Sequence, residues 1–245
     1  MSAGVYPPLF HLYRKKGLYV FRFFKDFHWL YVLIDNRLPV NRNNNKIIFA
    51  TCAEPREFWV PLMEKAFAKL HGCYGALISG FINEGLSDMS GLPAHSEKIR
   101  VKDTKSMIEF WEKLKYLLDG KTMMGCSRAG KTNQAEVIID DTHTGLFENH
   151  AYSLLEAFII EDSKNNRFIR LVRIRNPWGG SEWKGAWSDE SPELEQFVDE
   201  LDEHVKKLPK EELWQPGVND GTFLMEFSDF CSIFTELYMC LEVGK

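Results

Sequence analysis

The stretch RLVRIRNPWGGSEWKGAWSDESPEL, residues 170–194, decides how the second half of the chain folds. Its first part has the pattern of a β-strand that ends at Asn176, because Pro177 holds the preceding residue in an extended conformation. An earlier stretch, ENHAYSLLEAF at 148–158, has the pattern of a second strand, which opens at His150. Adjacent antiparallel strands of this kind would place His150 beside Asn176.

A neighbouring His150 and Asn176 have a specific chemical use. The amide oxygen accepts a hydrogen bond from one ring nitrogen, which fixes the tautomer and leaves the other nitrogen for a nucleophile. The amide adds no charge, so a thiolate–imidazolium pair can form next to it. Trp178 would shield this bond from water. The alternative is that His150 is an ordinary strand residue and Asn176 a turn former before proline.

Composition limits the classes of protein to consider. The chain has 245 residues, 44% of them apolar and 27% charged, as in a folded domain with a sizeable core. Its net charge of −5 argues against nucleic acid as the main partner. We find no apolar run long enough for a membrane span and no secretory signal. The five cysteines are odd in number and scattered, which indicates free thiols in a reducing, cytoplasmic setting.

The first half of the chain alternates strand and helix patterns. We expect a hairpin of strands 17–24 and 27–38, followed by helices at 57–72 and 106–120. The glycines and proline of 80–98 predict a linker between two lobes. Ile108, Trp111, Leu114 and Leu118 are expected to form the buried face of the second helix.

The second half is mostly β-strand. The expected strands are 121–127, 136–140, 150–160, 167–175, 222–227 and 234–242. One helix interrupts them, with Ser191 as its N-cap and Pro192 in its first turn. The chain therefore reads as α+β. We expect an extension at 1–16, a first lobe at 17–98 and a second lobe at 99–245.

The stretch GCSRAGKT, Gly125–Thr132, fits the pattern of a phosphate-binding loop, but its surroundings do not. Such a loop must open a helix, whereas the residues that follow are β-branched and lack helical spacing. We expect a β-hairpin here, with 129–134 as the turn, and no nucleotide. Nucleotide binding remains the weakest of three functional readings.

Several longer stretches together resemble the protease core of the calpains, Ca²⁺-dependent papain-like cysteine peptidases. They are FKDFHWLYVLIDNRLP, EFWVPLMEKAFAKLHGCYGAL, GLSDMSG, NHAYSL, RIRNPWGGSEWKGAWSD and DGTFLMEFSDF, in family order from about residue 17 to 240. The resemblance implies a papain-like core with a partial first lobe and an antiparallel second lobe. It also implies protein or peptide substrates, with His150 as catalytic base, Asn176 as its orienter and Trp178 against both.

The resemblance also identifies what is missing. The family's nucleophile lies in a Q-x-x-x-G-x-C-W segment ahead of the hairpin, and nothing in 1–16 matches it. None of the five cysteines replaces it, so the chain alone is expected to be inactive. Either it is a truncated form of an active peptidase, which Met1 directly ahead of GVYPPLF favours, or it is a paralogue that lacks the catalytic cysteine. The paralogue would be a non-catalytic protein-binding module.

The resemblance further implies a calcium site in the second lobe. The matching acids are Glu182, Asp189 and Asp220, whose oxygens suit a hard cation. Where the family pattern has a further acid, this chain has Thr222, and this replacement lowers the negative charge of the site. The alternative is that Glu182 and Asp189 are solvated loop acids.

Overall fold

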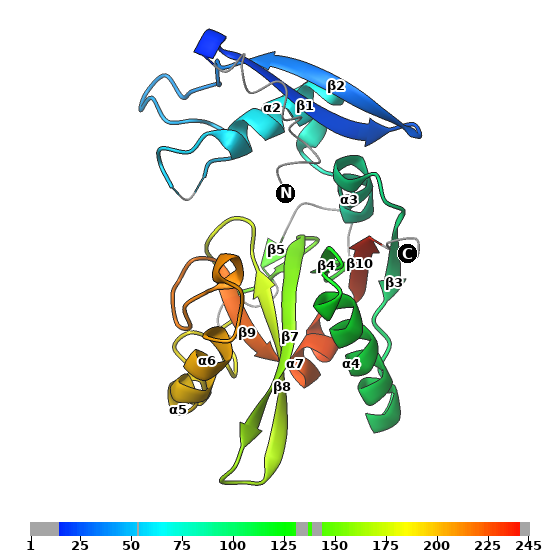
Figure 1. The fold of residues 1–245 in the computed structure, drawn as a ribbon, viewed down its shortest axis with the longest axis vertical. Helices are drawn as coiled ribbons and strands as arrows, with labels where there is room; N and C mark the ends of the chain where they lie inside the picture. Colours follow the sequence, from blue (N-terminus) through cyan, green and yellow to red (C-terminus); the bar gives the residue numbers. More distant parts are fainter. Residues whose placement is uncertain (1–14, 53, 131–136, 139–143, 241–245) are drawn as a thin grey trace. The chain divides into compact units, whose positions relative to one another are not determined.

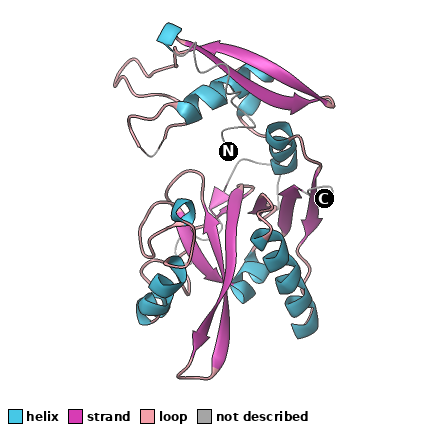
Figure 2. Cartoon of the chain, in the orientation of Figure 1, coloured by secondary structure: helices cyan, strands magenta, loops and turns pink. Residues whose placement is uncertain are grey.

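The computed structural model describes residues 15–52, 54–130, 137–138 and 144–240. These residues divide into two compact units, one up to Ala94 and the other from His95 onward. Figures 1 and 2 show their helices and strands, and each unit is described by itself. The fold is the α+β class that the sequence predicts.

The first unit is a hairpin packed on a helix. Strand β1 (Leu18–Lys25) pairs with β2 (His28–Asp35), and α2 (Trp59–Leu70) lies against them. The two turn residues, Asp26 and Phe27, both have positive φ, as a tight hairpin with the twist of its strands requires. The apolar residues shared by strands and helix form one core, namely Phe21, Phe23, Val32, Ile34, Leu62 and Ala66. A short 3₁₀-helix follows at Tyr74–Leu77.

The expected linker at 80–98 contains the boundary between the two units, at Ala94 and His95, but it is made of regular structure. It holds α3 (Ile82–Ser90), which ends at a left-handed Gly91, and then β3 (Ala94–Lys98). Within this segment Met89 packs on the hairpin core and Asp88 is buried. Lys25 pairs with Asp88 at 3.2 Å, which ties α3 to the end of β1.

The second unit is built on a six-stranded sheet with the order β3-β10-β4-β7-β8-β9. The remaining strands are β10 (Glu236–Cys240), β4 (Met124–Ser127), β7 (Tyr152–Asp162), β8 (Arg167–Arg175) and β9 (Thr222–Glu226). The pairs from β10 through β9 are antiparallel. Because β7 and β8 form one long hairpin, the start of β7 lies beside the end of β8.

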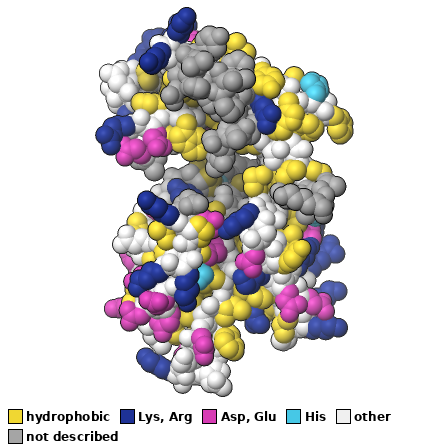
Figure 3. Space-filling view, in the orientation of Figure 1, with side chains coloured by type: hydrophobic (Ala, Val, Ile, Leu, Met, Phe, Trp, Pro, Cys, Tyr) yellow, Lys and Arg dark blue, Asp and Glu magenta, His cyan; other side chains and the backbone are white. Residues whose placement is uncertain are grey.

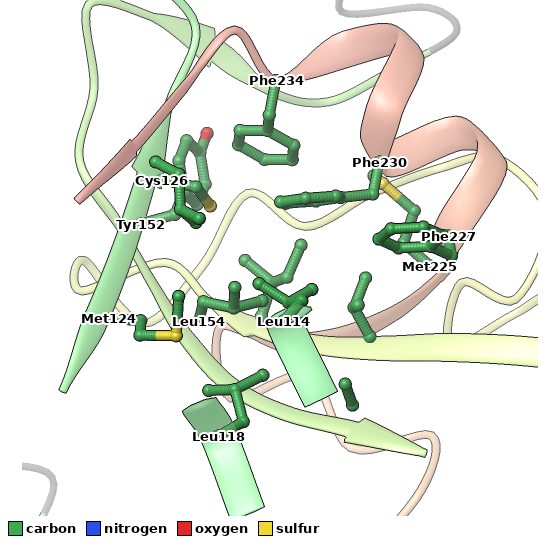
Figure 4. Close-up of a cluster of buried hydrophobic side chains, with 14 of the residues drawn as sticks. Leu114, Leu118, Met124, Cys126, Tyr152, Leu154, Met225, Phe227, Phe230 and Phe234 are labelled. Atoms are coloured by element: carbon green, nitrogen blue, oxygen red, sulfur yellow. The ribbon is translucent and has the colours of Figure 1, made fainter. Parts of the chain in front are cut away.

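The main core of this unit lies between the sheet and two helices, α4 (Thr104–Asp119) and α7 (Phe227–Ile233). Figure 4 shows part of it, including Leu114, Leu154 and Phe230. The predicted face of α4 is confirmed at Trp111, Leu114 and Leu118, but Ile108 is 39% exposed. Helix α7 was not predicted, and it fills the gap between the expected strands 222–227 and 234–242.

A second core covers part of the same sheet under α5 (Pro192–Gln196) and α6 (Val198–Val205). The sequence predicted one helix here, and Ser191 does cap its start by accepting from the N–H of Leu194 at 3.1 Å. The helix is interrupted at Phe197, whose side chain is buried in this core. Acidic side chains gather around α5 and α6 on the face seen in Figure 3. A 3₁₀-turn follows at Lys210–Glu212.

The hairpin expected around Gly125–Thr132 is wrong in its pairing. Strand β4 pairs with β10 and β7, whereas the short β5 (Val137–Ile138) pairs with β6 (Phe147–Glu148). The end of the phosphate-loop pattern, 131–132, lies outside the described residues. None of the helices in the described ranges is both long and apolar enough to cross a bilayer.

Candidate functional site

The ends of β7 and β8 bring His150 and Asn176 together. Ser153 of β7 is paired with Arg175, the last residue of β8, so the residues just outside the two strands face each other. Asn149 has a positive φ of 54°, which turns the chain immediately before the histidine. His150 Nε2 lies 2.9 Å from Asn176 Oδ1, and both side chains are buried, at 3% and 0% exposure. The geometry is the one that the strand pattern predicts.

The hydrogen bonds of Asn176 fix which way its amide points. Its Nδ2 donates to the backbone carbonyls of Gly180 at 2.5 Å and Ser181 at 3.0 Å. Its Oδ1 accepts from the backbone N–H of Trp178 at 3.1 Å. A flipped amide would set oxygen against two carbonyls, so this orientation is required.

The amide in turn fixes the tautomer of the histidine. Because Oδ1 is an acceptor only, His150 Nε2 must carry the hydrogen that joins the two side chains. Proton exchange with a reacting group is then the task of the other ring nitrogen, Nδ1. This division of labour is the one that a general base held by an amide requires.

Aromatic rings surround the histidine. The ring of Trp178 lies 4.5 Å from that of His150, and the rings of Tyr152 and Phe147 follow at 4.8 and 5.6 Å. Trp178 is itself 59% exposed, so it covers the pair from the solvent side. Apolar surroundings strengthen the His150–Asn176 hydrogen bond.

The predicted calcium ligands Glu182 and Asp189 lie side by side. Burial, and then the hydrogen bond with Asp189, raise the pKa of Glu182 from 4.5 to about 7. Burial and the charge of Asp220 raise the pKa of Asp189 as well. The two raised pKa values indicate that the pair retains a proton to higher pH than separate carboxyls would, and Glu182 Oε1 accepts from the backbone N–H of Gly221 at 2.5 Å. Both acids line an open cavity of about 780 Å³.

The third predicted ligand lies farther out. Asp220 is exposed, and its Oδ1 accepts from the N–H of Thr222 at 2.8 Å. In the described part of the chain, no three His, Cys, Asp or Glu side chains converge as a metal-binding group. The acids nevertheless fit a cation, because Asp189 Oδ2 is buried with no hydrogen-bond partner among the described residues. Such an oxygen is stabilised by a positive charge beside it.

The cysteines of this unit do not have the properties of a nucleophile. Burial raises the pKa of Cys231 to about 12 and that of Cys126 well above its usual value. Cys240 is buried too, whereas Cys52 and Cys73 belong to the first unit. An activated thiol needs the opposite shift of its pKa.

Sequence reasoning missed the backbone part of the site. The carbonyl of Gly221 accepts from the N–H of Asn176 at 2.7 Å. The carbonyls of Gly180 and Ser181 accept from the side chain of Asn176. Backbone groups have no residue-type signature. The doublet Asp220–Gly221 ahead of β9 was the one available signal of a turn with special geometry.

Known proteins provide an independent comparison. A family described as "Calpain family cysteine protease" matches residues 5–241. Relatives include a calpain of Schistosoma mansoni, 36% identical over 225 residues, and human calpain-8, also 36% identical over 225 residues. Drosophila calpain-A is 36% identical over 230 residues. Each match covers 91% of this chain but 27%, 29% and 25% of the relative, so the chain spans less than a third of their length.

Proposed function

The chain belongs to the calpain family of cysteine proteases, and from this premise we propose that it forms the part of a calcium-responsive endopeptidase core that carries the base. His150 is the general base and Asn176 holds it. The single observation that supports this most is the amide network of Asn176, which fixes the Nε2–H tautomer of His150. The five free cysteines fit a reducing, cytoplasmic location.

In this proposal His150 moves protons in both halves of peptide hydrolysis. A cysteine thiolate attacks the substrate carbonyl, and the imidazolium gives its Nδ1 proton to the departing amine. The resulting thioester is cleaved by a water whose proton returns to the imidazole. Asn176 stabilises each imidazolium without adding charge. Residues 1–245 supply the base and its orienter but no matching nucleophile, so we expect no turnover by this chain alone.

Calcium is the proposed regulator. Glu182, Asp189 and Asp220 would hold it, and when bound its positive charge would offset both the burial and the mutual repulsion that raise the pKa of the first two. Thr222, in the position of a further acid, weakens this site.

A casein-cleavage assay tests the proposal, with the longest transcript product that encodes this chain compared with residues 1–245. We expect the longer protein to cleave casein in Ca²⁺, to be blocked by iodoacetamide, and to lose activity in His150→Ala. Cleavage that His150→Ala leaves intact would refute the assignment. The alternative, a binding module, predicts retention of casein by both proteins with no cleavage by either.

A further inference from the structure

We propose that Glu182 is also a positioning residue for the His150–Asn176 pair, acting through the backbone of Gly221 and separately from any metal. This inference rests on the proposed function, because the orientation of Asn176 matters only if His150 is a base. It assigns a role to an uncharged feature of Glu182, namely the acceptor oxygen Oε1.

The supports of Asn176 converge on Glu182. On the backbone side, the N–H of Asn176 donates to Gly221 O at 2.7 Å, and the N–H of Gly221 donates to Glu182 Oε1. On the side-chain side, Asn176 Nδ2 donates to the carbonyls of Gly180 and Ser181, the two residues directly before Glu182. A displacement of Glu182 would therefore disturb both sides of the asparagine.

Gly221 needs such a support. Its φ is +89°, a conformation that side chains disfavour, and a Cβ there would lie 2.7 Å from Gly179 Cα and 2.8 Å from Asn176 O. Only glycine fits, and glycine is also the residue whose backbone rotates most freely. The direction of its carbonyl therefore depends on the hydrogen bonds of its peptide groups, and Glu182 provides the one at its N–H.

The chemistry separates this role from metal binding. Glu182 accepts from the N–H of Gly221 through Oε1, and its carboxyl lies beside that of Asp189. Glutamine reproduces both contacts, because its amide has one acceptor oxygen and a donor nitrogen, but it lacks the charge that a cation needs. Alanine reproduces neither contact. Aspartate keeps the charge but is one methylene too short to reach the same N–H.

These three substitutions of Glu182 form the test. The probe is the Nε2–H signal of His150 in ¹⁵N-labelled residues 1–245, in chelator, assigned by its absence from His150→Ala. We expect Glu182→Gln to keep this signal and its slow exchange with solvent. Glu182→Ala and Glu182→Asp should speed that exchange by about tenfold or more, the effect of losing a hydrogen bond that holds the acceptor. Thermal melting of each variant shows whether the second unit is folded.

The outcomes distinguish the two proposals. If the natural chain shows no protected Nε2–H, the His150–Asn176 pair fails, and the proposed function fails with it. If the signal is present but folded Glu182→Ala and Glu182→Asp exchange as slowly as the natural chain, only the positioning role is overturned. Loss of the signal in Glu182→Gln would also overturn the positioning role, because the His150–Asn176 pair would then require the charge of Glu182 and not its hydrogen-bond acceptor. If Glu182→Ala does not fold, Glu182→Asp decides the matter.

Discussion

The most informative perturbation is a change of pH around the Glu182–Asp189 pair, with Glu182→Gln as the matched variant. The pKa of Glu182 is raised in the folded chain from 4.5 to about 7. A carboxyl whose pKa is raised by folding stabilises the fold while it is protonated. This contribution is complete below about pH 4.5 and is lost as the pH rises through about 7. The second unit should therefore be less stable at pH 8.5 than at pH 5.

The size of the effect follows from the two pKa values. The difference between 4.5 and about 7 corresponds to at most about 3.4 kcal/mol. Because the Glu182 side chain is partly exposed, solvent screens the interaction, and we expect about 1 to 2 kcal/mol. For a unit of this size, that change lowers the melting temperature by about 2 to 8 °C.

Tryptophan-fluorescence melts at pH 5 and 8.5, in chelator, measure this loss of stability. Other groups titrate over the same range, so the relevant quantity is the difference between the natural chain and Glu182→Gln. The glutamine variant keeps both hydrogen bonds at any pH, and its melting temperature should fall less between the two pH values. If the melting temperatures of the two proteins depend equally on pH, folding does not raise the pKa of Glu182, and the prediction is refuted. The opposite sign would refute it as well, namely a melting temperature that rises from pH 5 to pH 8.5 by more in the natural chain than in Glu182→Gln.

Three other predictions follow from the site and the core. Purified residues 1–245 should cleave no casein in Ca²⁺, and iodoacetamide-sensitive cleavage would show that one of the five cysteines is active after all. Millimolar Ca²⁺ should raise the melting temperature by a few degrees, because a ligand at about 100 times its dissociation constant stabilises the folded state by roughly 2.7 kcal/mol. Asp189→Ala should abolish that rise and Thr222→Glu enlarge it, whereas identical melts in Ca²⁺ and chelator for all three proteins would exclude the site. Leu114→Ala, at a side chain with 0% exposure, should cost about 2 to 5 kcal/mol in denaturant unfolding. Ile108→Ala on the same helix should cost far less, and similar losses for the two would contradict the packing.

The sequence was a good guide wherever side-chain periodicity reports the environment of a residue. The β1–β2 hairpin, α2, α4 and the long β7–β8 pair all follow from alternation or helical spacing of apolar residues. The meeting of His150 and Asn176 follows as well, because each stands at the end of a strand and the strands are antiparallel neighbours. Strand ends are positions that a pattern can locate.

The errors have physical causes of a different kind. The glycines and proline of 80–98 located the boundary between the two units but gave no sign of α3, whose apolar contacts outweigh the low helix propensity of Gly85. The pairing of β5 with β6 is a tertiary choice that no local pattern encodes. The bond between Glu182 and the N–H of Gly221 joins residues 39 apart through a backbone group. It therefore has neither a period nor a residue-type signature.

The hydrogen bonding of Asn176 favours a catalytic over a merely structural reading of His150. A buried amide must have its polar atoms paired, and the carbonyls of Gly180 and Ser181 with the N–H of Trp178 already achieve this. The bond from His150 is therefore additional to what burial of Asn176 requires. What it adds is a fixed tautomer at a ring held among aromatic side chains. Fixing a tautomer contributes little to packing, whereas proton transfer at Nδ1, the role proposed for His150, depends on it.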